Sequence, residues 1–85
     1  MVGDLSLKYS GVIHQQLDAT GMLCPMPLLK MKLALKNMAE GEILRLTADD
    51  SGSLRDIPLY INKSNHSMIE METCSDVYQF LIKKG

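Results

Sequence analysis

The most constraining feature of this 85-residue sequence is a hydrophobic repeat whose period changes along the chain. Within residues 25–38, apolar side chains such as Leu28, Met31 and Leu35 recur at the spacing of a helix. Within residues 43–48 they alternate with polar side chains, which is typical of a strand with one wet face. A chain that carries both patterns is expected to pack helices against a sheet.

Further segments carry one of these two patterns, and turn-forming residues separate them. They are a strand candidate at 12–17, a second, shorter helix at 54–61, and strands at 69–72 and 78–83 that form a hairpin through 74–76. Pro58 should kink the second helix or mark the end of its first turn. The order predicts an α+β fold, a two-layer βαβαββ sandwich with both helices on one face of a four-stranded mixed sheet and polar side chains on the other.

The length allows one hydrophobic core, so residues 12–85 are predicted to form a single domain. Residues 1–11 alternate poorly and contain glycine and serine, which favours a flexible N-terminal extension. With 46% hydrophobic and 22% charged residues, the composition is that of a folded globular protein.

The formal net charge of -1 argues against strong binding to nucleic acid or to an anionic membrane, because both need a basic surface. No apolar run reaches the roughly 18 to 20 residues that span a bilayer. Residues 1–11 have neither the basic start nor the apolar middle of a signal peptide. We therefore expect a cytoplasmic protein.

The sequence Cys24-Pro25-Met26-Pro27 lies where the first turn meets the first helix. Prolines are tolerated in the first helical turn, so we expect Cys24 to be the N-cap and Pro25 the first helical residue. The unpaired amides of Met26 and Leu28 and the helix dipole should then stabilise a thiolate. The alternative is that Cys24 is a small, packed hydrophobic side chain.

Residues 17–30, LDATGMLCPMPLLK, followed by residues 48–50 and 55–58, closely resemble the TusA/SirA family of sulfur carriers. The likeness runs from about residue 17 to residue 84, and its most specific element is the Cys-Pro-x-Pro motif. It implies a βαβαββ sandwich in which Cys24 accepts sulfur as a persulfide and passes it to a partner protein. The implied donor is a cysteine desulfurase or another sulfurtransferase, and the implied pathways are tRNA thiolation, sulfur oxidation or related sulfur trafficking. No cofactor is expected beyond the persulfide sulfur.

Around Cys24 the expected supporting residues are Gly21, Pro25, Met26, Pro27 and Leu28. A second charged cluster, Asp49, Asp50, Arg55 and Asp56, has two interpretations. It can cap and anchor the second helix, with Ser53 and Asp56 as a capping box, and we favour this interpretation. Alternatively, Asp50, Arg55 or Asp56 lies near Cys24 and orients the persulfide or a docking partner.

Four apolar residues, Met22, Met26, Leu29 and Leu33, could form an exposed, adaptable docking patch beside Cys24 or could simply fill the core. Cys74 is expected to be packed at a strand end rather than to act as a resolving thiol. His14 and His66 have no neighbours at the spacing of metal ligands, so no metal site is expected.

Two other functions stay open at this point. One is a nucleic-acid-binding or regulatory module that uses the open face of the sheet, although Glu70 and Glu72 suit that role poorly. The other is a thiol redox protein that uses Cys24 and Cys74.

Overall fold

The computed structural model describes residues 11–85, so the extension predicted for residues 1–11 lies outside the described part apart from Gly11. The secondary-structure elements follow the predicted order. They are β1 (Gln15–Ala19), α1 (Met26–Lys36), β2 (Ile43–Ala48), α2 (Ser53–Lys63), β3 (Ser67–Cys74) and β4 (Val77–Lys83). Neither of these helices is long and apolar enough to cross a membrane.

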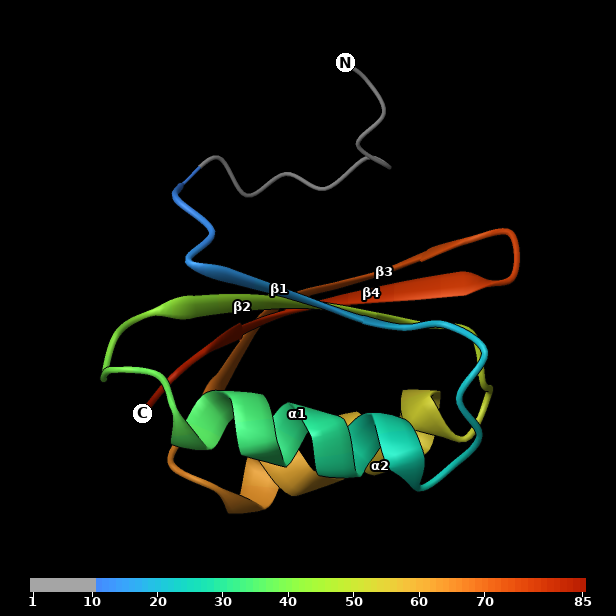
Figure 1. Ribbon diagram of the computed structural model, residues 1–85, viewed down its shortest axis with the longest axis horizontal. Helices are drawn as coiled ribbons and strands as arrows, with labels where there is room; N and C mark the ends of the chain where they lie inside the picture. Colours follow the sequence, from blue (N-terminus) through green and yellow to red (C-terminus); the bar gives the residue numbers. More distant parts are fainter. Residues whose placement is uncertain (1–10) are drawn as a thin grey trace.

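The strands form one mixed sheet in the order β1-β2-β4-β3. β1 runs parallel to β2, whereas β4 is antiparallel to both β2 and β3. Both helices lie on the same face of this sheet (Figure 1). The predicted two-layer βαβαββ sandwich is therefore confirmed.

The hydrophobic core lies between the helices and the sheet. Alternate residues of β2 and β4 point into it, and each helix contributes an apolar stripe, as the two periods predict. Its fully or nearly fully buried members include Met31, Leu35, Leu44, Leu46, Ile57, Ile61, Phe80 and Ile82. Each such side chain contributes about 1.5–3 kcal/mol through its burial.

The opposite face of the sheet is less polar than the sequence pattern indicates. In the register of β3 with β4, Glu70 pairs with Leu81 and Glu72 pairs with Gln79, so these four residues share that face. Leu81 is nevertheless completely buried, although it lies outside the main core. The aromatic rings of Tyr78 and Phe80 belong to the helix side, which leaves β4 without the exposed stacking surface that sheets use to bind RNA bases.

Most element boundaries differ from the prediction by a few residues. The first strand begins at Gln15 rather than at residue 12, because ladder pairing with β2 begins there with Gln15 opposite Leu44. Just before it, the His14 ring nitrogen Nδ1 accepts a hydrogen bond from the Ile43 amide. The second helix is as long as the first, 11 residues each, and it continues through Pro58.

The parallel pair β1 and β2 determines where the two helices begin. Ala19, the last residue of β1, lies opposite Ala48, the last residue of β2. Each strand then leads through a short loop into a helix, so the N-termini of α1 and α2 lie at the same edge of the sheet (Figure 1). Loops at the carboxyl ends of parallel strands are the usual place for functional residues in such folds.

Candidate functional site

The loop between β1 and α1 is held in shape before it reaches Cys24. Asp18 Oδ1 accepts hydrogen bonds from the backbone amide and the hydroxyl of Thr20, at 3.0 and 2.6 Å. Gly21 follows with φ of 82°, a left-handed conformation that only glycine adopts without strain. Its amide donates to Asp49 Oδ1 at 2.9 Å and so ties this loop to the loop after β2. Gly21 therefore shapes the loop that leads to Cys24 through its backbone conformation and its hydrogen bond to Asp49.

The first turn of α1 is displaced by one residue from the prediction. Pro25, not Cys24, is the N-cap, because the Pro25 carbonyl accepts the first helical hydrogen bond, from the Leu29 amide at 3.0 Å. The Met26 amide does not face the sulfur but donates to the Leu23 carbonyl at 2.8 Å. Cys24 therefore lies just outside the helix.

The other residues of the motif connect the site to the core. Pro27 is fully buried, and Leu28 packs against the core cluster. Met26, by contrast, is 42% exposed. The motif therefore anchors α1 through its second proline while it leaves Cys24 and Met26 at the surface.

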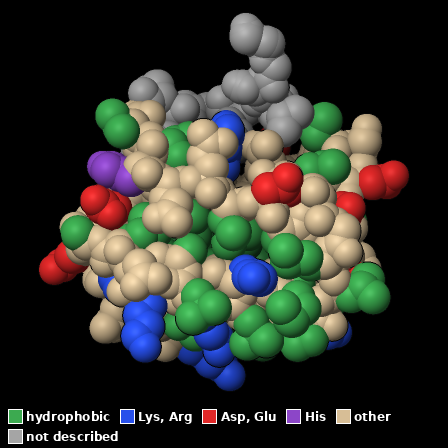
Figure 2. Space-filling model, viewed as in Figure 1, with side chains coloured by type: hydrophobic (Ala, Val, Ile, Leu, Met, Phe, Trp, Pro, Cys, Tyr) green, Lys and Arg blue, Asp and Glu red, His purple; other side chains and the backbone are tan. Residues whose placement is uncertain are grey.

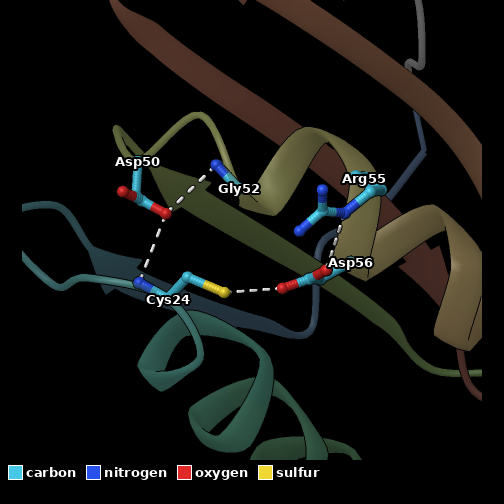
Figure 3. Close-up of polar contacts among 5 residues, drawn as sticks. All are labelled: Cys24, Asp50, Gly52, Arg55 and Asp56. Atoms are coloured by element: carbon cyan, nitrogen blue, oxygen red, sulfur yellow. Dashed lines mark hydrogen bonds and ion pairs between the residues drawn. The ribbon is translucent and has the colours of Figure 1, made fainter.

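Asp50 joins the two loops directly beneath Cys24. One oxygen of its carboxylate, Oδ2, accepts hydrogen bonds from the Cys24 amide at 3.2 Å and from the Gly52 amide at 3.1 Å (Figure 3). A carboxylate shared by two amides of different loops fixes their separation. Asp50 therefore positions the backbone of Cys24. Its place beside Cys24 agrees with one of the two sequence interpretations, and the role of orienting the persulfide or a docking partner stays a prediction.

Gly52 approaches the cysteine side chain so closely that a larger residue would force Asp50 or Cys24 to shift. A Cβ atom at this position would lie 3.1 Å from Cys24 Cβ, 3.3 Å from Cys24 Sγ and 2.9 Å from Asp50 Oδ2. The backbone at the start of α2 thus forms one wall of the sulfur site. Sequence analysis missed this residue, because a glycine in a turn gave no signal beyond that turn.

The sulfur itself contacts Asp56 in the first turn of α2. The Cys24 thiol donates to Asp56 Oδ2 at 2.6 Å, and the second oxygen, Oδ1, lies 3.4 Å from Arg55 Nε (Figure 3). The Asp56 side chain is only 20% exposed, whereas that of Arg55 is 79% exposed. The structure therefore brings Asp50 and Asp56 to Cys24, and Arg55 reaches the site through Asp56.

The electrostatics of this contact are opposite to those predicted. The hydrogen bond to Asp56 raises the pKa of the Cys24 thiol above its usual value, and partial desolvation and the Asp56 and Asp50 charges act in the same direction. The nearby Arg55 charge opposes them. The same hydrogen bond lowers the pKa of Asp56. The prediction of a thiolate stabilised by the helix start is wrong for the isolated protein, because a carboxylate and not a set of free amides faces the sulfur.

The favoured capping box at Ser53 and Asp56 is also wrong. Gly52 is the N-cap of α2, and no side-chain hydrogen bond caps this end of the helix. Among the described residues the buried Ser53 hydroxyl has no hydrogen-bond partner. The reason is that the Asp56 carboxylate turns toward Cys24 and Arg55 instead of reaching back to the helix start.

An apolar surface extends from Cys24 along α1, and Figure 2 shows hydrophobic side chains gathered over this helix among lysines. We call it the α1 patch and define it by four exposed side chains: Leu23 at 72%, Met26 at 42%, Leu29 at 44% and Leu33 at 58% exposure. Of the two alternatives left open for Met26, Leu29 and Leu33, the structure therefore shows the exposed one. Met22 differs, because it is partly buried against the core.

The other residues that the sequence singled out lie elsewhere. Cys74 is exposed at the end of β3, which contradicts the expectation that it would be packed. Its strand-end position leaves it opposite Val77 at the turn, outside the core. His14 Nδ1 bonds the Ile43 amide, and His66 Nδ1 accepts from the Gly85 amide. Within residues 11–85 no group of three acidic, histidine or cysteine side chains could hold a metal ion.

Cys24 lies outside the groove between α2 and β3. That open groove of about 600 Å³ is lined by residues such as Pro58, Leu59 and Met68, and Cys24 is not one of them. Cys24 is instead exposed at the edge where both helices begin. This arrangement suits exchange at sulfur with a large reactant, because the approach to Sγ is open.

Comparison with known proteins agrees with this geometry. The sequence model of the family described as Sulfurtransferase TusA matches residues 15–84. The crystal structure of a SirA-like protein from Desulfitobacterium hafniense is similar, with a TM-score of 0.72 and 25% sequence identity. That match covers 84% of this chain and 97% of the other.

Proposed function

The chain belongs to the TusA sulfurtransferase family, and from this premise we propose that it carries sulfur as a persulfide on Cys24 and passes it to a partner protein. The observation that carries the proposal is the open position of Cys24, an exposed thiol at the junction of two helix starts. Its backbone is fixed by Asp50 and its side chain is directed by Asp56. A thiol that is fixed and accessible suits sulfur exchange with another protein.

The proposed loading step is an exchange at sulfur. Cys24 Sγ attacks the outer sulfur of a donor persulfide, a new S–S bond forms at Cys24, and the donor's own S–S bond breaks. The donor cysteine leaves with the electron pair and takes up a proton, so no net oxidation or reduction takes place. Delivery is the same exchange with Cys24 as the donor: an acceptor cysteine attacks the outer sulfur of the loaded Cys24, and Cys24 leaves as the thiolate. Neither step needs a metal or an organic cofactor.

The partner surface is proposed to be the α1 patch. Isolated exposed apolar residues are ordinary, but four on adjoining turns beside the reactive atom form a contiguous surface of the kind that binds proteins. Leucine and methionine side chains adapt to different surfaces, which suits a carrier that must contact both a donor and an acceptor. We propose a cysteine desulfurase or another sulfurtransferase as the donor and a sulfur-accepting protein as the acceptor.

Intact-mass measurement after incubation with a cysteine desulfurase and cysteine tests the proposal. The wild-type protein and Cys74→Ser should each gain the mass of one sulfur atom, and this gain should disappear on treatment with a reductant. Cys24→Ser should gain none. Loading that persists in Cys24→Ser and disappears in Cys74→Ser would transfer the role to Cys74 and overturn the proposal.

A further inference from the structure

We propose that Asp56 is a positioning residue that distinguishes the unloaded from the loaded carrier: it holds the free Cys24 thiol against α2 and releases the side chain once Sγ carries a second sulfur atom. The inference rests on the proposed function, because it concerns the two chemical states of that same cysteine. It assigns Asp56 a role in the exchange that differs from the capping role expected for it.

The unloaded state is defined by a closely packed contact. Cys24 Sγ lies 2.6 Å from Asp56 Oδ2, and Gly52 lies close enough that an added Cβ atom would stand 3.3 Å from the sulfur. Asp56 is itself held by Arg55 and is mostly shielded from solvent. The acceptor is therefore fixed in place, and the thiol proton determines which way the Cys24 side chain points.

The loaded state cannot keep this contact. A persulfide carries its proton on the outer sulfur, so Cys24 Sγ has none to donate and would face the Asp56 carboxylate with lone pairs alone. The outer sulfur is bonded about 2.05 Å from Sγ, and the Asp56 oxygen at 2.6 Å already occupies the space on that side. The side chain must then turn away from α2, which presents the outer sulfur to the solvent side where a partner docks.

The charges around the sulfur support this assignment. Asp56 and Arg55 face it from α2 and Asp50 faces it from the preceding loop, while the first turn of α1 contributes no acidic residue. The single contact accounts for the largest part of two opposite shifts, because it raises the pKa of Cys24 and lowers the pKa of Asp56. Replacing the thiol proton should therefore remove the largest cause of the lowered Asp56 pKa.

Loading releases one proton and takes up another, both through solvent. Cys24 gives up its thiol proton to solvent, and the Sγ thiolate forms the bond to the donor's outer sulfur. The donor's S–S bond breaks, and its inner sulfur leaves as a thiolate. That thiolate takes up a proton from solvent, so atoms and charges balance.

A titration of the Asp56 carboxyl carbon by NMR tests the inference without any partner enzyme. The protein carries Cys74→Ser, and its Cys24 is measured as the free thiol and as the methyl disulfide made with methyl methanethiosulfonate, which is a stable analogue of the loaded sulfur. We expect the pKa of Asp56 to rise in the disulfide form toward the ordinary value of about 3.9. Asp18, whose pKa is lowered by its hydrogen bonds from Thr20, is the internal reference and should keep its titration in both forms. An Asp56 titration that does not change between the two forms overturns the inference.

A second measurement follows the thiol side of the same contact. The rate of alkylation of Cys24 by iodoacetamide is recorded against pH for Cys74→Ser alone and with Asp56→Asn or Glu40→Gln added. Asp56→Asn should move the midpoint of the rate profile to lower pH. If the midpoint falls by about one pH unit, the alkylation rate near neutral pH should rise about tenfold. Glu40→Gln removes the same charge at a distance and should leave the profile in place. Equal midpoints in all three proteins would overturn the inference.

These results are distinguishable from a failure of the proposed function. If Cys24 gains no sulfur from a desulfurase but the Asp56 titration responds to the methyl disulfide, the contact is real and the persulfide role is wrong. If Cys24 gains sulfur and the titration does not respond, the carrier role stands and Asp56 does not distinguish its two states.

Discussion

At Cys24, two helix starts and one carboxylate act on the same sulfur atom. A helix N-terminus carries about half a positive charge and favours a thiolate, but this effect acts mainly through free amide groups. Several of those amides are already used, since Met26 donates to Leu23, and Ser53 and Leu54 donate to carbonyls of the preceding loop. Asp56 is therefore the group in direct contact with the sulfur, and its effect prevails.

Gly52→Ala should disturb the site through steric overlap alone. The added methyl group would stand closer to Asp50 Oδ2 and to Cys24 than van der Waals contact allows, so one of these side chains must move. We expect a loss of about 1–3 kcal/mol in the free energy of unfolding, measured by urea denaturation, together with slower sulfur loading. Ser51→Ala, at an exposed position of the same loop, is the matched control and should change neither quantity. A Gly52→Ala protein that matches wild type in both would show that the close approach is absent.

The paired pKa shifts predict how stability depends on pH. The pKa of Cys24 is raised in the folded state, so its contribution is complete below the unfolded thiol value of about 8.5 and is lost as pH rises through the folded value. The pKa of Asp56 is lowered, so its contribution is present above about 3.9 and is lost as pH falls through the folded value.

Urea denaturation of wild type and Asp56→Asn from acid to alkaline pH measures both losses of stability. The difference in the free energy of unfolding between the two proteins should be greatest at intermediate pH. It should shrink at acid pH, where Asp56 is protonated, and at alkaline pH, where Cys24 loses its proton. Asp18, whose pKa is lowered by its bonds to Thr20, keeps its own acid dependence in both proteins. A difference that is constant at all pH values would contradict the assignment.

At the scale of elements, α1 has one face that packs on the sheet and stabilises the fold, and another face that is exposed. Met31 and Leu35 are buried against the sheet, whereas Leu29 and Leu33 are exposed. The buried face alone suffices to hold the helix in place, because packing supplies most of the stability of a helix this short. The exposed face is then free to contact a partner.

Leu33→Glu should therefore impair docking without unfolding the protein. We expect the free energy of unfolding to stay within about 0.5 kcal/mol of wild type. The concentration of carrier that half-saturates a desulfurase should rise severalfold, while the maximal loading rate changes little, because binding and not chemistry is affected. Leu59→Glu makes the same exchange at an exposed leucine of α2 and serves as the control. Equal effects of the two substitutions would show that the α1 patch is not the docking surface.

The sequence predicts best the elements whose pattern is set by their own residues. The strand at 43–48 is predicted to the residue, because its alternation ends at a glycine on one side and a turn on the other. The start of α1 is displaced by one residue because a local turn, from the Met26 amide to the Leu23 carbonyl, competes with the helix for Cys24. The motif identifies Cys24, but the contact with Asp56 joins residues 32 positions apart and depends on how two loops meet. No local pattern encodes such a contact.

At the scale of the whole molecule, the parallel pairing of β1 and β2 brings the two loops of the site together. The sheet also separates the buried apolar residues into two groups, one on each of its faces. The crossover through α1 returns β2 alongside β1, so that the chain leaves both strands at one edge and starts both helices there. The helix side holds the main core, while Ile43 and Leu81 are buried on the other side. These two are diagonal neighbours in the register of β2 with β4.

This division predicts which destabilising substitutions add together. Ile43→Val and Ile57→Val remove the same methylene group from opposite sides of the sheet, and each should cost about 0.5–1.5 kcal/mol by urea denaturation. Because Ile57 belongs to the main core and Ile43 lies outside it, the double variant should lose the sum of the two costs to within about 0.5 kcal/mol. Ile57→Val with Ile61→Val is the contrasting pair, since these side chains lie one turn apart in the same core and their cavities can relax together. If the first pair departs from additivity as much as the second, the two sides of the sheet are energetically coupled, and changes on the face away from the helices would then reach the loops that hold Cys24.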